Sequence, residues 1–177
     1  MTSSPAKTVP DSSASPPSQG QGNPGIVPDY ELIELLFFAY RDFVGEPDRL
    51  LEKHGFGRAH HRVVHFVNRN EGLTVAELLD ILEITKQSLA RVLKDLISGG
   101  FVEQRSGQED RRQRLLFLTP KGRALADQLV GMQSRRISRA IAGAAPESRG
   151  LIAKFLSELI DRERPGSAGQ RISTGTI

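Results

Sequence analysis

The fold is decided by residues 74–100, which read TVAELLDILEITKQSLARVLKDLISGG. Within them, the stretches 74–82 and 85–98 each carry leucine, isoleucine or valine at helical spacing. Only Glu83 and Ile84 separate the two stretches, so the two predicted helices must cross instead of continuing in one line. Such a crossing is typical of a helix-turn-helix, whose second helix lies in the major groove of DNA.

The second predicted helix has an apolar face and a polar face. The residues that we expect to point into the core are Leu89, Val92, Leu93, Leu96 and Ile97. The residues that we expect to point outward are Lys86, Gln87, Ala90, Arg91 and Lys94. Long polar side chains can reach base edges, and lysine and arginine bind phosphates. The outward face is therefore predicted to contact DNA; the alternative is an ordinary core helix with a solvated face.

Two strands joined by a polar loop are predicted next, at 101–105 and 113–118. The loop is too long for a two-residue turn and predicts a wing. Arg111 and Arg112 lie at its tip, where a guanidinium group suits a narrow minor groove. We expect Asp110 to orient Arg112 and not to touch DNA, because phosphates repel a carboxylate. The alternative for the two arginines is that they only make the loop more soluble.

These segments resemble the MarR family of winged helix-turn-helix regulators. The motifs are Thr-Lys-Gln-Ser-Leu-x-Arg-Val-Leu-x-x-Leu at 85–96, Gly-Phe-Val-Glu at 100–103, Asp-x-Arg at 110–112 and Leu-Thr-Pro-Lys-Gly at 118–122. The resemblance runs from about residue 30 to residue 164. It implies a homodimer held by its first and last helices, a recognition helix in the major groove and a response to a small molecule. Within the family, His60-His61 and Arg112–Arg114 are similar to the PetP-like branch.

The resemblance also assigns DNA contacts, residue by residue. It implies base-edge contacts by Lys86, Gln87 and Ser88. It implies phosphate contacts by Thr85, Arg91 and Lys94, and a minor-groove contact by Arg112. With Asp110 and Arg111 of the wing, these residues make up the predicted DNA-binding set, and double-stranded DNA is the predicted partner.

Helices that flank the predicted DNA-binding lobe, residues 58–122, are unusually apolar. The first, at about 29–45, has apolar residues on most of its surface and is expected to end at Glu46-Pro47. The C-terminal helices, within 120–163, carry a second apolar set: Leu151, Ile152, Phe155, Leu156, Leu159 and Ile160. So small a lobe cannot cover both sets, so we expect a homodimer.

The predicted architecture is one mainly α domain, residues 28–164, with a small β-wing and with dimerisation helices at both ends. Residues 1–27 and 165–177 consist largely of serine, proline, glycine and other small or polar residues, and we expect them to be disordered.

Composition limits the function further. Residues 85–123 hold nine basic side chains against four acidic ones, whereas residues 29–57 hold three against seven, so one end of the molecule suits a polyanion. The chain has no cysteine, which excludes disulfides and thiolate metal sites. No apolar run is long enough to span a membrane, so we expect a cytoplasmic protein that works at the bacterial nucleoid.

An enzyme is not expected, because neither a phosphate-binding loop nor a Gly-x-Ser-x-Gly motif is present. The predicted function is sequence-specific transcriptional regulation from a near-palindromic operator. The alternatives are a non-specific architectural DNA-binding protein and a winged-helix module that binds proteins.

Two histidines four residues apart, His61 and His65, would share one face of a helix. That spacing permits ligation of a divalent metal or haem iron, and the family's effector pocket lies near this segment. Packing, capping or subunit hydrogen bonds are the alternative roles. The two histidines are therefore the candidate effector ligands, and the sequence specifies neither a cofactor nor an effector.

Overall fold

The computed structural model describes residues 27–107, 111–145 and 147–161. Along these ranges the elements are α1 (Tyr30–Glu52), α2 (Arg58–Arg69), β1 (Leu73–Thr74), α3 (Val75–Leu82), α4 (Lys86–Ser98), β2 (Val102–Ser106), β3 (Arg114–Leu118), α5 (Pro120–Ile141) and α6 (Ser148–Glu158). Asp110 and the two predicted disordered arms, apart from Val27, lie outside the described residues.

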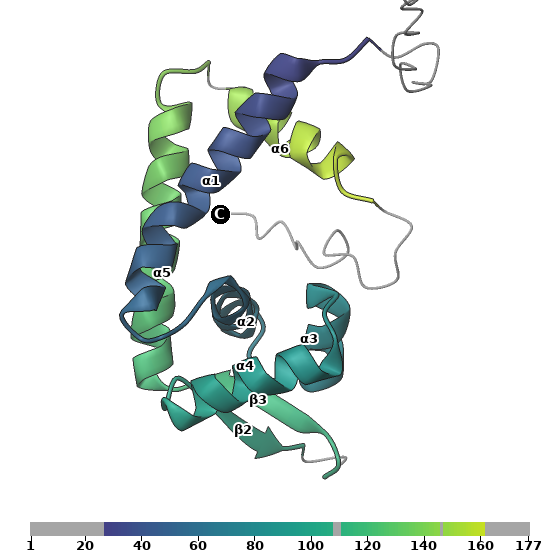
Figure 1. Cartoon of the computed structure of the whole chain (residues 1–177), viewed down its shortest axis with the longest axis vertical. Coiled ribbons are helices and arrows are strands. Elements are labelled where there is room, and N and C mark those ends of the chain that lie inside the picture. Colours follow the sequence, from purple (N-terminus) through teal and green to yellow (C-terminus); the bar gives the residue numbers. More distant parts are fainter. Residues whose placement is uncertain (1–26, 108–110, 146, 162–177) are drawn as a thin grey trace, which may run out of the picture.

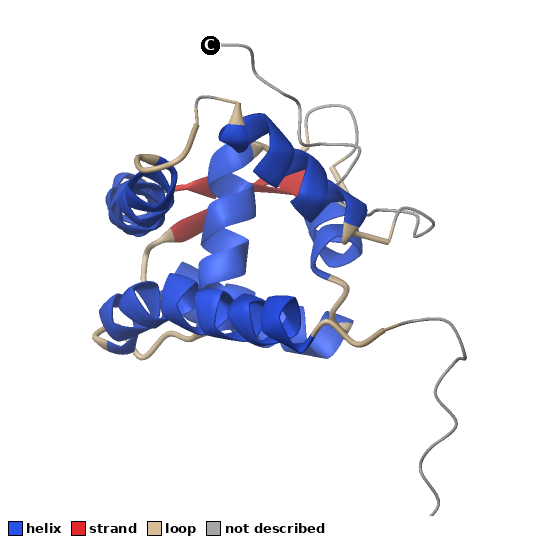
Figure 2. Ribbon diagram, turned by 90° about the horizontal axis from the view of Figure 1, so that it is seen from above, coloured by secondary structure: helices blue, strands red, loops and turns tan. Residues whose placement is uncertain are grey.

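The predicted fold class is confirmed. Helices make up most of the described part, and the strands are confined to one small sheet (Figure 2). Figure 1 shows the lobe that contains this sheet at one end of α5, with α6 following the other end of α5. The long helices α1 and α5 pack against each other and connect the lobe to the end that carries α6.

The sheet has three strands, one more than predicted. Its order is β1-β3-β2, and β2 pairs with β3 in antiparallel fashion from Val102 opposite Leu118 to Ser106 opposite Arg114. The additional strand, β1, consists of two residues that pair with β3. Two residues are too few to show an alternating pattern in the sequence, so this strand is recognisable only from its pairing with β3.

The core lies between α2, α3, α4, the sheet and the first half of α5. The predicted inward face of α4 is buried, with the exception of Ile97. Ile97 is 38% exposed, so its prediction as a core residue is wrong. It lies on the edge of that face and lines an open groove between α3, α4 and β2.

The prediction that Glu46-Pro47 ends the first helix is also wrong. Proline inside a helix removes one backbone hydrogen bond and costs about 3 kcal/mol, yet α1 continues through Pro47 to Glu52. The continuation is favoured by packing, because Val44, Pro47 and Leu51 are all buried and α1 contacts α5 and α2. Burial of this segment outweighs the local cost of the proline.

Candidate nucleic-acid interface

The turn between α3 and α4 positions the predicted recognition helix. Glu83 ends α3 with a left-handed backbone, φ of +50°, which reverses the chain direction within two residues. Thr85 then caps α4, because its Oγ1 accepts a hydrogen bond from the backbone N–H of Ser88 at 3.1 Å. The helices therefore cross as the two-residue connection predicted.

The outward face of α4 is exposed at every position that was predicted. It carries three cations, Lys86, Arg91 and Lys94, and the amide of Gln87. None of these cations has an ion-pair partner among the residues that the structure describes. Uncompensated charge on one face of a helix attracts a polyanion.

Two predicted contact residues at the start of α4 also serve the local structure. Thr85 and Ser88 are exposed, but Thr85 Oγ1 donates to Ser88 Oγ at 2.9 Å in addition to its capping bond. A phosphate contact by Thr85 would therefore take the hydroxyl hydrogen now donated to Ser88 Oγ and would leave the cap, in which Thr85 Oγ1 accepts, in place.

The wing places Arg111 and Arg112 at the surface, beyond the ends of β2 and β3. Their contacts with DNA, like those of the α4 residues, remain predictions.

The strands of the wing separate two arginines, Arg105 and Arg114, that the sequence alone did not assign to DNA contact. Arg114 lies opposite Ser106 and donates to its Oγ at 2.8 Å, on the sheet face that continues from buried Leu116. Arg105 lies on the other face, where it pairs with Glu103 and its guanidinium is 4.4 Å from the centroid of the Phe117 ring. Strand alternation thus places the two arginines on opposite faces of the wing. We add Arg114, whose partner is a neutral hydroxyl, to the candidate interface and leave out Arg105, whose charge Glu103 balances.

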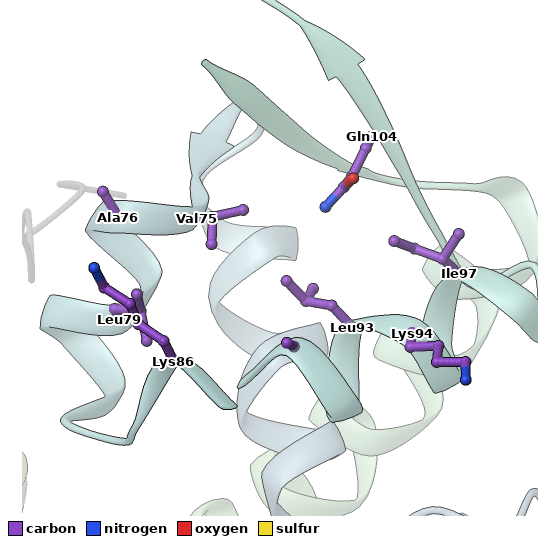
Figure 3. Close-up of a pocket in the computed structure, with 9 residues that line it drawn as sticks. Val75, Ala76, Leu79, Lys86, Leu93, Lys94, Ile97 and Gln104 are labelled. Carbon is purple, nitrogen blue, oxygen red and sulfur yellow. The ribbon is translucent and has the colours of Figure 1, made fainter. Parts of the chain in front are cut away.

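A groove of about 540 Å³ lies beside the outward face of α4. Its lining is mostly apolar, and Figure 3 shows it between α3, α4 and Gln104 of β2. Lys86 and Lys94 also line it. The candidate interface is therefore a basic helix face next to an apolar hollow.

The end of α4 is attached to the start of α5. Lys121 Nζ donates to the carbonyl oxygen of Gly99 at 2.8 Å and lies 4.2 Å from the centroid of the Phe101 ring. Thr119 Oγ1 donates to the carbonyl oxygen of Gly100 at 2.6 Å. Lys121 therefore neutralises the carbonyl end of α4, although by sequence it was one more charge of the basic region.

A second cavity, of about 360 Å³, lies between α1, α2 and α5. Both candidate effector histidines line it, together with Tyr40, Phe43, Val44, Arg58, Arg62, Phe66 and Gln133. Burial lowers the pKa of His61 and of His65 below the ordinary 6.5, and the proximity of His65 lowers the pKa of His61 further.

Within the described ranges, the histidine pair is not joined by a third side chain of the types that bind metal. Among the residues that the structure describes, no group of three His, Cys, Asp or Glu side chains could hold a metal ion. Neighbouring His60 has a local role: its Nδ1 accepts from the N–H of Gly57 at 3.1 Å, and its Nε2 lies 3.3 Å from Asp95 Oδ2 on α4.

Across the described residues, no helix is long and apolar enough to cross a membrane.

Known proteins are similar to this chain in sequence and in fold. The sequence model of the MarR family matches residues 54–113. The chain is 47% identical to the HTH-type transcriptional regulator PetP of Rhodobacter capsulatus over 129 residues, which cover 73% of this chain and 78% of PetP. This likeness confirms the similarity predicted from His60-His61 and Arg112–Arg114.

Two solved structures have a similar fold. One is Streptococcus pneumoniae FabT in complex with DNA, with a TM-score of 0.65, 21% identity and coverage of 74% of this chain and 94% of FabT. The other is a MarR transcriptional regulator from Methanosarcina mazei, with a TM-score of 0.61, 22% identity and coverage of 76% of this chain and 90% of that one.

Proposed function

The chain belongs to the MarR family of DNA-binding transcriptional regulators, and from this membership we propose that it binds a near-palindromic operator as a homodimer whose affinity responds to a small ligand. Its relatives and its fold are those of regulators and not of enzymes. The observation that carries the proposal is the row of exposed cations on α4 beside the wing, which have no ion-pair partner in the part of the chain that the structure describes.

Dimerisation is supported by two apolar surfaces that the monomer leaves exposed. On α1 they are Tyr30, Leu32, Ile33, Leu35, Leu36, Phe37, Phe38 and Tyr40. On α6 no residue is buried, and the large apolar side chains of α6 and of the two residues after it are 39% to 64% exposed. Apolar area of this extent is typical of a permanent interface, so α1, α5 and α6 are the proposed dimerisation helices and residues 58–122 the proposed DNA-binding lobe.

In the proposed complex, each α4 lies in a major groove with Lys86, Gln87 and Ser88 at the base edges. Thr85, Arg91 and Lys94 bind phosphates, and Arg111, Arg112 and Arg114 reach from the wing toward the minor groove. The two copies of α4 must be about 34 Å apart to enter successive major grooves. FabT supports this arrangement, because its fold is similar and it was solved in complex with DNA.

A ligand response is supported by the cavity between α1, α2 and α5. It combines aromatic walls with two guanidinium groups and two imidazoles, a mixture of apolar surface and few polar groups that is typical of small-molecule sites. It also adjoins both the proposed dimerisation helices and the lobe, so a ligand there contacts both parts.

The experiment that tests the proposal is selection of genomic fragments by the purified full-length chain, followed by footprinting. A protected near-palindrome with two half-sites one helical turn apart supports a dimeric regulator working at the nucleoid. Even protection of mixed DNA would instead identify a non-specific architectural protein. Unchanged DNA binding after replacement of Lys86, Arg91 and Lys94 together would contradict the assigned interface.

A further inference from the structure

Arg62 connects the α1–α2–α5 cavity to the turn that positions α4. It lies on α2 and lines the cavity. Its Nη2 donates to the carbonyl oxygen of Leu82 at 2.8 Å. Leu82 is the last residue of α3, and the left-handed Glu83 follows it directly. One side chain thus contacts both the ligand cavity and the helix-turn-helix.

The contact with Leu82 supplies something that α3 lacks. The last carbonyl groups of a helix have no partner within the helix, and they favour a nearby cation. The last turn of α3 contains no basic residue of its own. Arg62 therefore provides from α2 the positive charge and the donor that stabilise the end of α3.

The two arginines of the cavity differ in their partners. Arg58 Nε donates to Asp48 Oδ2 at 2.9 Å, so its charge is already balanced. Arg62 has no carboxylate partner among the residues that the structure describes. Of the two guanidinium groups, Arg62 is the one available to an incoming anion.

We propose that Arg62 is the relay of the ligand response: an aromatic anion in this cavity binds its guanidinium and withdraws it from the carbonyl oxygen of Leu82. The exchange is favourable because a hydrogen bond between two charged groups is stronger than one to a neutral carbonyl. The aromatic ring would lie against Tyr40, Phe43 and Phe66. This inference rests on the proposed ligand response and names its first step.

The consequence is a loosened connection between α3 and α4. Without Arg62, the end of α3 loses its donor, and residues 82–86 gain freedom to move. Because two copies of α4 must match the spacing of one DNA turn, freedom at this turn weakens operator binding. The ligand must bind the state in which Arg62 has left Leu82 more tightly than the state that binds DNA, because only such a difference in affinity shifts the equilibrium.

Three variants of the full-length chain test the contact without any ligand. Arg62→Gln removes the charge, Arg62→Lys keeps it, and Arg69→Gln is the matched control, because it removes an exposed guanidinium from the same helix that does not line the cavity. We expect Arg62→Gln to bind the selected operator roughly tenfold more weakly and to exchange the amide hydrogens of residues 82–86 faster. Arg62→Lys retains most of the affinity, and Arg69→Gln matches the wild type in both measurements.

Benzoate and its neutral analogue benzamide test the relay in the wild-type chain. Benzoate at millimolar concentration should lower operator affinity and speed exchange at residues 82–86, and benzamide should do neither. In Arg62→Gln, benzoate should produce no further change. Thermal unfolding of each variant separates a local effect from a loss of the fold.

Three results would overturn the relay. The first is that Arg62→Gln has the same amide exchange and the same operator affinity as the wild type. The second is that benzoate has an effect of equal size on Arg62→Gln and on the wild type. The third is that benzoate has no effect on the wild type. Failure of the proposed function is distinguishable, because then the wild type protects no defined DNA site. The exchange measurement on the free protein decides the Arg62 contact in either case.

Discussion

The carbonyl oxygen of Phe101 lies where a side chain at position 122 would begin. A β-carbon built on Gly122 would be 1.9 Å from this oxygen, far inside contact distance. The oxygen is also held in place, since it accepts the backbone N–H of Thr119 at 3.1 Å. Only glycine at position 122 therefore allows α5 to start against the end of α4.

Gly122→Ala should destabilise the protein by about 3 kcal/mol, because the backbone of Phe101 or the start of α5 must shift. Urea denaturation of the variant measures the loss. Gly143→Ala is the matched control, since a β-carbon there meets nothing within 4 Å. Equal urea midpoints for Gly122→Ala and wild type would refute the close contact.

Arg112→Ala should weaken operator binding by about 1 to 3 kcal/mol. The residue lies on the exposed wing, so removing its side chain should not change the fold. Gel-shift titration against the selected operator measures the affinity, and circular dichroism checks the fold. Wild-type affinity would show that the wing is not a DNA contact.

Lys94→Ala should behave differently, because a phosphate contact carries no sequence information. Affinity should fall alike for the operator and for mixed DNA, and the slope of log affinity against log salt should shrink by about one unit. A loss restricted to the operator would instead assign Lys94 to a base edge.

Phe155→Asp should prevent dimerisation, since it places a carboxylate in the exposed apolar face of α6. Sedimentation equilibrium at micromolar concentration should then show a smaller species than wild type. Lys154→Gln makes the same one-unit charge change at the neighbouring, also exposed position and is the control. A wild type that sediments as a stable monomer would contradict the proposed homodimer.

Acid should destabilise the fold through buried His61 and half-buried His65. Their pKa values are lowered in the folded chain, so the unfolded chain takes up protons first as the pH falls through 6.5. The contribution to stability is complete above that pH and decreases below it. A His61→Gln, His65→Gln double variant should lose less stability than wild type between about pH 7.5 and 5.5; parallel curves would show that neither histidine contributes.

The parts of the fold that could be predicted are those with local signals. The spacing of Leu89, Leu93 and Leu96 places α4, and the two-residue turn before it forces the crossing. By contrast, the continuation of α1 through Pro47 depends on packing with α5, and residues near Pro47 in the sequence give no signal of that packing. The contact between Arg62 and Leu82 joins residues 20 positions apart, so in the sequence Arg62 is only one more polar residue of α2.

The continuous α1 belongs to two apolar clusters at once. Its first half exposes Leu32, Leu36 and Phe37, and its second half buries Leu51 in the core of the lobe. If the exposed half is covered only in the dimer, folding and association become one equilibrium, and stability follows mass action. Each tenfold dilution should then remove about 1.4 kcal/mol from the dimer. The number of copies in a cell would thereby set how much folded regulator exists, before any ligand or operator acts on it.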